Sequence, residues 1–160
     1  MIIAATGHRP NKLIFEYDMT GPMSNWIANE IDMVLDAYKP EMCISGMALG
    51  IDMLFAACAL YKKIPVAAAI PFEGQEKMWP EKSQDIYNKL LAHKLVTKYY
   101  VCEPGYAAYK MQLRNEWMTD RCDLLLAVWD GSAGGTGNCV KYAIREQKEI
   151  IYINPKDFLK

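Results

Sequence analysis

Short apolar runs alternate along this chain with stretches in which apolar residues recur at helical spacing. The runs cover residues 2–6, 42–45, 65–70, 98–102, 124–129 and 150–154, and turn-forming or polar residues bound them, which is typical of strands. Helical spacing lies between successive runs. It predicts a helix that begins near Pro22, helices over residues 53–63, 81–93 and 138–149, and one that includes Leu113 and Met118.

This alternation predicts one α/β domain over residues 1–160. Nearly continuous apolar runs such as VAAAI and LLLAV suit parallel strands that helices cover on both faces. We therefore expect a three-layer, doubly wound and mostly parallel sheet, with residues 98–102 at its edge. Ligands of such sheets lie outside the carboxyl ends of the strands. One rim should then hold the loops that begin at Thr6, Ser45, Pro71, Glu103 and Asp130.

The last of these loops carries the clearest candidate chemistry. Residues 124–137 have the sequence LLLAVWDGSAGGTG, in which a buried strand precedes a loop with four glycines, and a helix is expected to follow. This order brings backbone N–H groups and a helix N-terminus together, where they suit a phosphate or another anion. Thr136 and Ser132 offer additional hydroxyl donors. The alternative is a tight turn whose glycines only relieve crowding.

A second glycine-containing loop follows the strand at residues 42–45. Its sequence SGMALGID leads into a helix rich in small residues, so its glycines favour either close helix–sheet packing or contact of Ser45 and Gly46 with a ligand. Asp52 falls in the first helical turn, where it is either a helix cap or a ribose ligand. The loop after the first strand, TGHRPNKL, is long for a compact domain, and long loops at strand ends are often functional.

Charge and cysteine content exclude several classes of protein. A formal net charge of −1 and a pI of about 6.1 leave no global basic footprint of nucleic-acid binding, although a local basic patch stays open. Five single cysteines without a C-x-x-C pair, and only two histidines, argue for reduced thiols and against a disulfide frame or a metal site. Without a signal-peptide pattern or an apolar segment of roughly 18 residues, we expect a cytoplasmic protein.

Two motifs resemble those of known families. SGMALGID resembles the SG-x-A-x-GID signature of the DNA-processing protein DprA, and residues 114–137, RNEWMTDRCDLLLAVWDGSAGGTG, resemble the second half of the LOG proteins, which are cytokinin-activating phosphoribohydrolases. Both belong to the SLOG superfamily of Rossmann-like proteins. With its early TGHRP loop and its PFEGQEKMW segment, nearly the whole chain is similar to the small YpsA-like (DUF1273) branch. The resemblance implies a Rossmann-like fold, a nucleotide, nucleotide-derived signal or single-stranded DNA as ligand, and a homodimer or higher homo-oligomer.

The LOG pattern can be transferred residue by residue only in part. An arginine in the helix before the strand and the glutamate of PGG-x-GT-x-x-E take part in N-glycosidic cleavage in that family. Arg114 matches the arginine, and the loop glycines match at Gly134, Gly135 and Gly137. However, Asn138 replaces the threonine, and Lys141, which cannot stabilise an oxocarbenium-like centre, stands at the glutamate. The resemblance then implies binding without cleavage, unless another acid acts: Glu116, Asp120, Asp130 or Glu73.

Other candidate residues carry two interpretations each. The guanidinium of Arg114 suits phosphate but also suits a surface carboxylate. His8 and Arg9 are either a base contact and an anion clamp or a turn histidine and a solvated arginine. Gln75 and Trp79 either recognise a base by amide hydrogen bonds and stacking or pack against the sheet. The full candidate ligand-binding set is Gly7, His8, Arg9, Ser45, Gly46, Gln75, Trp79, Arg114, Asn115, Asp130, Gly134, Gly135, Thr136, Gly137 and Asn138.

These observations favour a protein that senses or sequesters a nucleotide or a nucleotide-derived signalling ligand. The first alternative is a LOG-type nucleotide N-glycosidase or phosphoribohydrolase, which leaves open whether the chain is an enzyme. The second is DprA-like binding of single-stranded DNA, which the absence of a basic surface signature disfavours. We expect no cofactor, no metal and no membrane partner.

Overall fold

The strands form one six-stranded sheet in the computed structural model, which describes residues 1–13 and 19–160. Its order is β4-β3-β2-β1-β5-β6, and each neighbouring pair is parallel. The strands are β1 (Ile2–Gly7), β2 (Met42–Ser45), β3 (Val66–Ile70), β4 (Val96–Tyr100), β5 (Leu124–Val128) and β6 (Glu149–Ile153). The sheet is thus wholly parallel, where the sequence predicted a mostly parallel one.

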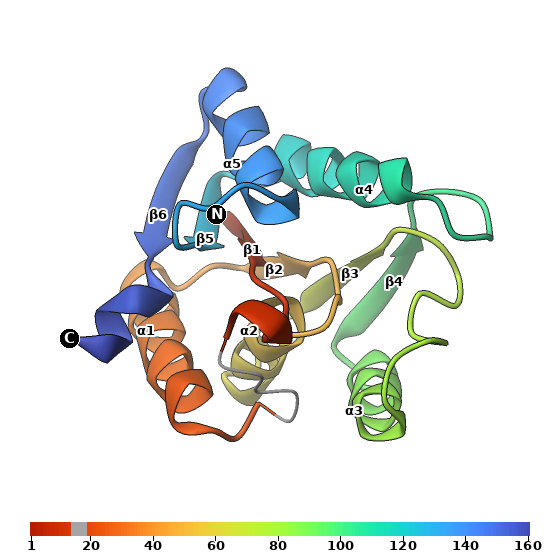
Figure 1. Cartoon of the computed structure of the whole chain (residues 1–160), viewed down its shortest axis with the longest axis horizontal. Helices are drawn as coiled ribbons and strands as arrows, with labels where there is room; N and C mark the ends of the chain where they lie inside the picture. Colours follow the sequence, from red (N-terminus) through yellow and green to blue (C-terminus); the bar gives the residue numbers. More distant parts are fainter. Residues whose placement is uncertain (14–18) are drawn as a thin grey trace.

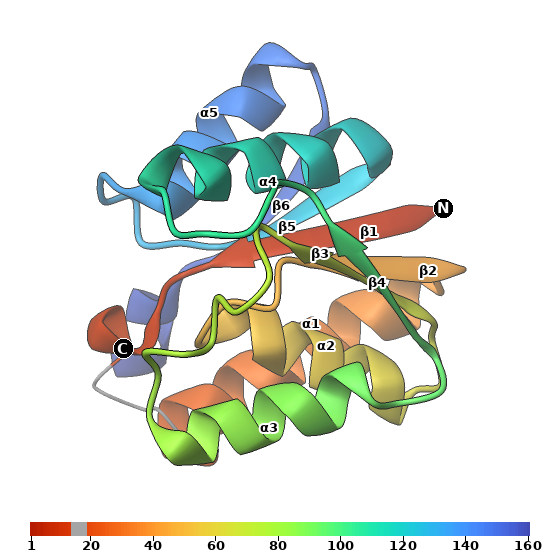
Figure 2. The same ribbon diagram turned by 90° about the vertical axis from the view of Figure 1, so that its right-hand side faces the viewer.

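Helices cover both faces of the sheet. Helices α1 (Pro22–Tyr38), α2 (Ile51–Tyr61) and α3 (Glu81–Leu91) lie on one face, and α4 (Ala108–Arg121) and α5 (Gly135–Arg145) lie on the other (Figures 1 and 2). Two short 3-10 turns, η1 (Pro10–Lys12) and η2 (Pro155–Leu159), follow β1 and β6. This arrangement confirms the predicted three-layer, doubly wound α/β domain.

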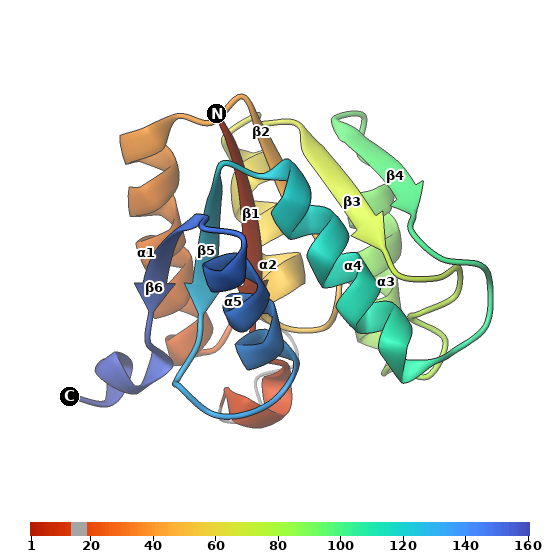
Figure 3. The ribbon, with the colours of Figure 1, turned by 90° about the horizontal axis from the view of Figure 1, so that it is seen from above.

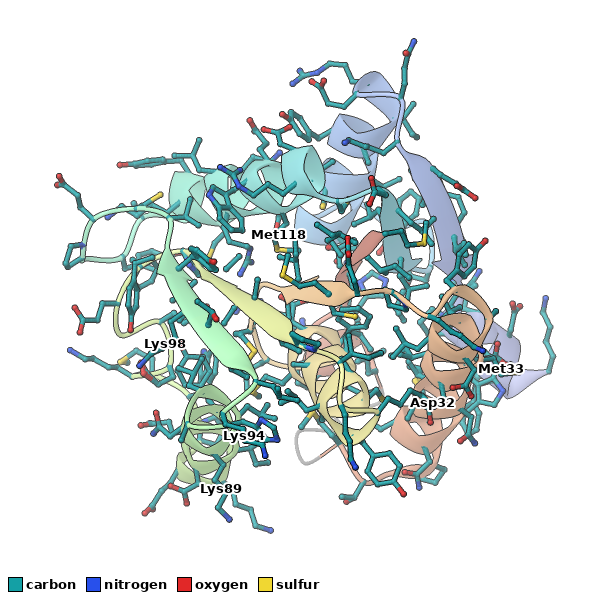
Figure 4. All side chains as sticks on the ribbon, turned by 180° about the vertical axis from the view of Figure 1, so that it is seen from behind. Asp32, Met33, Lys89, Lys94, Lys98 and Met118 are labelled. Atoms are coloured by element: carbon teal, nitrogen blue, oxygen red, sulfur yellow. The ribbon has the colours of Figure 1, made fainter. Side chains whose placement is uncertain are left out.

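The core forms where these layers meet. All five residues of β3 and all five of β5 are buried, as their continuous apolar character requires. Helix α1 presents the stripe Ile27, Ile31 and Leu35 to the sheet, and Met118 of α4 is buried on the opposite face (Figure 4). Each such side chain contributes about 1.5–3 kcal/mol when it is removed from water.

The main difference from the predicted elements concerns the edge strand. Strand β4 covers Val96–Tyr100, whereas the apolar pattern predicted residues 98–102. Four of its five residues are exposed, so neither of its faces imposes the burial that makes a strand visible in a sequence. The long loop after β1 contains η1, and its residues 14–18 lie outside the described part of the chain. All five cysteines are free thiols, as expected.

The order of the strands places a topological switch between β1 and β5. From β1 the chain winds to β2, β3 and β4 on one side, and then returns to place β5 and β6 on the other. Gly7 at the end of β1 is paired with Val128 at the end of β5. The loops after these strands therefore begin side by side, and Figure 3 shows η1 and the start of α5 at this same end of the sheet. Ligands of open α/β sheets bind at such a point.

Candidate functional site

A cavity of about 250 Å³ opens at the switch point, beyond the carboxyl ends of β1 and β5. It is built by the loop after β1, the turn before α2, one side of α4, and the loop that starts α5. Its lining residues are Thr6, Gly7, His8, Arg9, Asn11, Lys12, Ala48, Asp52, Arg114, Asn115, Ser132, Ala133, Gly134, Gly135, Thr136 and Gly137.

The glycine loop presents backbone N–H groups to this cavity. Helix α5 begins at Gly135, and the N–H of Asn138 donates the first helical hydrogen bond to the carbonyl of Gly134 at 2.9 Å. The N–H groups of residues 135–137 precede that bond and need partners from outside the helix. A Cβ atom on Gly135 would meet no other atom within 4 Å, so the backbone is open here. This end of α5 can therefore accept an anion.

Two side chains, one at the start of this loop and one from η1, hold the loop in place. The indole Nε1 of Trp129 donates to the carbonyl of Ser132 at 2.8 Å. From η1, the Lys12 ammonium donates to Ser132 Oγ at 2.9 Å and to the carbonyl of Ala133 at 3.1 Å. Lys12 thus ties the first loop to the glycine loop and leaves a cation at the mouth of the cavity.

His8 connects the same two loops through Asp130. Its Nε2 lies 3.0 Å from the backbone N of Asp130, which donates to it, and 2.9 Å from Oδ1 of that residue. Burial lowers the pKa of His8, against the opposing effect of the Asp130 carboxylate. Hydrogen bonds from Ser132, together with His8, lower the pKa of Asp130. Nε2 can accept the Asp130 N–H only while His8 is unprotonated, so protonation of His8 would break this link between the two loops.

Arg114 enters the cavity from α4 and is almost fully buried. Its Nε donates to Oδ1 of Asn115 at 2.9 Å, and its Nη1 donates to the carbonyl of Gly46 at 2.6 Å. Within the described part of the chain, Nη2 has no hydrogen-bond partner. Desolvation lowers the pKa of Arg114, and the Asp52 carboxylate opposes that shift. An arginine stays protonated at physiological pH, so Arg114 offers the cavity an oriented cation.

The turn between β2 and α2 is closed by contacts rather than open. A Cβ atom on Gly46 would lie 2.4 Å from Nη1 of Arg114, and one on Gly50, whose φ is +90°, would lie 2.6 Å from the carbonyl oxygen of His8. The Ser45 hydroxyl donates to the carbonyl of Asp52 at 2.6 Å. Glycine at residues 46 and 50 therefore permits close packing, which is the first of the two interpretations raised by the sequence.

The structure brings nine of the fifteen candidate residues to the cavity wall: Gly7, His8, Arg9, Arg114, Asn115, Gly134, Gly135, Thr136 and Gly137. The other six lie behind that wall or away from it. Four of them form hydrogen bonds that hold the lining segments in place: Ser45 with Asp52, Gly46 with Arg114, Asp130 with His8, and Asn138 with Gly134. Gln75 donates to the carbonyls of Gly46 and Met47, both at 3.3 Å. The Trp79 ring packs edge-on against Tyr87, with 5.2 Å between ring centroids.

Several lining residues were absent from the candidate set. Asn11 and Lys12 follow β1, as His8 does, and Thr6 lies within the end of that strand. The signal that marks all three is their position in the segment TGHRPNKL. Asp52, whose role the sequence left open, lines the cavity with 7% of its surface exposed. Ala48, Ser132 and Ala133 complete the wall.

The acids considered as substitutes for the LOG glutamate do not line the cavity. Glu73, Glu116, Asp120 and Asp130 are absent from its wall, and Lys141 is exposed on α5 outside it. Among the residues that the structure describes, Asp52 is the carboxylate in the lining. Burial raises the pKa of Asp52, while Arg114 and a hydrogen bond from the N–H of Ala48 oppose the rise.

A second cavity lies between α3 and β4. It is larger, at about 470 Å³, but it is an open groove lined by Glu73 and Glu76 as well as by Lys77 and Lys98. Its wall includes Tyr87, Asn88 and Leu91 from the later turns of α3, so among the described residues no helix N-terminus offers free N–H groups to it. Size alone would favour this groove, but the chemistry of its wall is mixed, so the cavity at the switch point is the better anion site.

The described residues contain no cluster of three or more His, Cys, Asp or Glu side chains that could hold a metal ion. Across the same residues, none of the helices has the length and apolar character that crossing a bilayer requires.

Comparison with known sequences identifies relatives over nearly the whole chain. The sequence profile of YpsA, described as the YspA SLOG family, matches residues 3–158. The SPbeta prophage-derived protein YoqJ of Bacillus subtilis is 38% identical over 115 residues, which is 62% of this chain and 67% of that protein. The UPF0398 protein YpsA of Bacillus subtilis is 28% identical over 143 residues, which is 84% of this chain and 79% of that protein.

Comparison with solved structures finds the same fold at low identity. DNA processing protein A (DprA) of Streptococcus pneumoniae has a TM-score of 0.68 and 17% identity, over 94% of this chain and 49% of that one. DprA of Helicobacter pylori, studied for its single-stranded DNA binding mode, has a TM-score of 0.68 and 16% identity, over 99% of this chain and 71% of that one. This chain spans about half the length of the pneumococcal protein.

Proposed function

This chain belongs to the YpsA family of SLOG proteins, and on that premise we propose that it binds a nucleotide or a nucleotide-derived signalling ligand at the switch point. The observation that carries the proposal is the meeting, in one cavity, of the N-terminus of α5 with Arg114, Arg9 and Lys12. Backbone N–H groups and a guanidinium are the donors that phosphate oxygens prefer. The protein then acts as a sensor or a sequestering protein in the cytoplasm.

Binding without cleavage is favoured over a LOG-type reaction. A phosphoribohydrolase needs a carboxylate near the glycosidic carbon, and the corresponding residue, Lys141, is an exposed lysine outside the cavity. The enzyme alternative now depends on Asp52, because it is the acid that lines the cavity in the described part of the chain. Incubation with nucleoside 5′-monophosphates, followed by chromatography for released base, separates the two: release of base would favour the enzyme.

Single-stranded DNA is the second candidate ligand, since a solved relative in fold is described by its binding of single-stranded DNA. The observation in its favour is local: Lys89, Lys94 and Lys98 are exposed together at the edge formed by α3 and β4 (Figure 4). Exposed Tyr100 lines the same groove as Lys98 and offers a stacking surface. The affinity for DNA bound at this edge should fall steeply as the salt concentration rises, and Lys94→Glu should abolish the binding.

We also propose that the chain forms a homodimer or higher homo-oligomer through the outer side of α4. Tyr106, Tyr109 and Leu113 are 76%, 64% and 43% exposed, and Tyr99 of β4 packs beside Trp117 of the same helix. Aromatic residues and arginine are enriched in protein interfaces, and Arg121 lies 4.0 Å above the Trp117 ring. A second copy would cover this surface. Light scattering should give a multiple of the 18.2 kDa chain mass, reduced by Leu113→Glu.

Ligand binding is tested by thermal unfolding with a panel of nucleotides and cyclic dinucleotides. A ligand at 100 times its Kd stabilises the folded state by about 2.7 kcal/mol, which corresponds to roughly 5–11 °C for a domain of this size. The matched variant is Gly135→Leu, whose side chain would enter the open space beside the start of α5. It should unfold near the wild-type temperature but lose the ligand-induced shift. No shift for any ligand with the wild-type protein would contradict the proposal.

A further inference from the structure

The cavity contains one residue that does not suit a purely anionic ligand. Asp52 lies in the first turn of α2 and is buried, yet its carboxylate lines the same wall as Arg114, Lys12 and the start of α5. A phosphate that contacted Asp52 would be repelled, because an ionised carboxylate only accepts hydrogen bonds. The ligand must therefore present a different group to this part of the wall.

The contacts of Asp52 leave one oxygen available for that group. Its Oδ2 accepts a hydrogen bond from the N–H of Ala48 at 3.3 Å and would lie 2.8 Å from a Cβ atom on Gly46. In the described part of the chain, Oδ1 has no hydrogen-bond partner. Arg114 lies against the same glycine, so its cation and the Asp52 carboxylate are neighbours at one end of the cavity.

A role for Asp52 in neutralising the charge of Arg114 does not by itself explain how the two side chains are placed. The two hydrogen bonds of the guanidinium go to Asn115 and to the carbonyl of Gly46, and neither goes to Asp52. A carboxylate whose task was only to neutralise Arg114 would be expected to form the bidentate pair for which both groups are shaped. Asp52 lines the cavity and keeps Oδ1 without a hydrogen-bond partner among the described residues, and Nη2 of Arg114 is unpartnered there as well.

We propose that Asp52 accepts hydrogen bonds from the ribose hydroxyls of the bound nucleotide, so that the cavity selects ribonucleotides over 2′-deoxyribonucleotides. The inference rests on the proposed binding function and names its ligand class more closely. The phosphate accepts hydrogen bonds from the N–H groups of residues 135–137 and lies beside the cations of Arg114, Arg9 and Lys12. The sugar then turns its hydroxyl groups toward Asp52. A deoxyribose lacks the 2′-hydroxyl donor and leaves the buried carboxylate less well satisfied.

The test is calorimetric titration of the whole chain with AMP, GMP, CMP and UMP and with their 2′-deoxy counterparts. A hydrogen bond to a charged group changes affinity by roughly 10- to 100-fold. The wild-type protein should bind the best ribonucleotide tighter than its deoxy counterpart by that factor. Asp52→Asn, which keeps the size of the side chain and an acceptor for the Ala48 N–H, should reduce the ratio to about one and leave the deoxynucleotide affinity near its wild-type value.

The control variant is Asp85→Asn, because Asp85 is an exposed carboxylate on α3 away from the cavity, and it should keep the wild-type ratio. Equal wild-type affinity for both sugars would overturn the inference even if Asp52→Asn failed to fold. An equal loss for both sugars in Asp52→Asn would also overturn it, since Asp52 would then only position Arg114. Binding of neither sugar would remove the proposed function as well, so the two failures are distinguishable.

Discussion

Two glycine-containing turns lie at the same end of the sheet, and the structure uses their glycines in opposite ways. In the turn before α2, residues 45–52, a Cβ atom on Gly46 would lie 2.4 Å from Nη1 of Arg114. In the open loop, residues 129–137, which runs into the first turn of α5, a Cβ atom on Gly135 would meet nothing within 4 Å. The first turn is closed around protein groups, and the second is open to a ligand. A glycine cluster in a sequence does not by itself distinguish these uses.

The largest effect is expected from Gly46→Ala in the closed turn. The added methyl group would collide with the Arg114 guanidinium and with Asp52, and overpacking of this kind typically destabilises by about 1–3 kcal/mol. Thermal or urea unfolding measures the loss, and nucleotide affinity should fall with it because Arg114 must move. If Gly46→Ala unfolded at the same midpoint as the wild-type protein, the turn would not be closed.

Arg114→Lys tests whether the closed turn acts on the ligand through the guanidinium. A lysine keeps the charge but cannot donate to Asn115, to Gly46 and to a phosphate from one planar group. We expect nucleotide binding about tenfold weaker, which is ~1.4 kcal/mol, by calorimetry. Arg145→Lys, in the exposed last turn of α5, is the control and should bind normally. Unchanged affinity in Arg114→Lys would place the phosphate elsewhere.

Acidification should weaken the link between the first loop and the open loop. The pKa of His8 is lowered in the fold, so its contribution to stability is complete above the unfolded value of about 6.5 and is lost as pH falls below it. The lowered pKa of Asp130 acts in the same direction below about pH 4. Wild-type protein should lose more stability than His8→Gln between pH 7.5 and 5.5, by at most about 1.4 kcal/mol per pH unit. Equal slopes would show that His8 does not titrate abnormally.

Lys12→Met removes the other link to the open loop. The variant loses hydrogen bonds to Ser132 and Ala133, but Lys12 is exposed, so stability should change by no more than about 0.5 kcal/mol. Nucleotide affinity should fall several-fold and depend less on salt, because one cation leaves the cavity mouth. Lys82→Met, in the exposed first turn of α3, should behave as wild type. Equal effects of the two substitutions would contradict a specific role for Lys12.

Gly135→Ala, in the open loop, should change stability less than Gly46→Ala does in the closed turn. The methyl group of the alanine would meet no atom within 4 Å, and alanine restricts the unfolded chain. The free energy of unfolding should therefore change by less than about 1 kcal/mol in either direction. Paired with Gly46→Ala in one unfolding experiment, it isolates the difference between the two turns. A loss of stability as large as that of Gly46→Ala would show that protein groups pack against Gly135 as well, and that this loop is not open to a ligand.

The fold was predictable because its strands are apolar enough to be recognised without any partner. Residues 124–129 and 65–70 predicted β5 and β3 closely, since strands buried on both faces leave continuous apolar runs. Strand β4 was displaced by two residues, because its exposed residues carry no such signal. The prediction of one rim of loops followed from parallel topology, and it correctly placed the loops after β1 and β5 together.

The lining of the cavity was predictable from the sequence only where a motif marks it. Gly134 and Gly135 belong to a recognisable loop, whereas Lys12 reaches its partner Ser132 across 120 residues of sequence. Gln75 was interpreted as a base contact, but its amide lies against the carbonyls of Gly46 and Met47. Such contacts depend on how distant segments pack, which local periodicity does not encode. Whether Gln75 and Trp79 also approach a ligand stays a prediction.

The central claim is that the open loop holds the phosphate of a nucleotide, and a crystal structure with the tightest-binding nucleotide tests it most directly. We predict a phosphate oxygen within hydrogen-bond distance of the backbone N–H groups of residues 135–137, with the Arg114 guanidinium beside it. A nucleotide bound instead in the groove between α3 and β4, with the cavity at the switch point empty, would contradict the account.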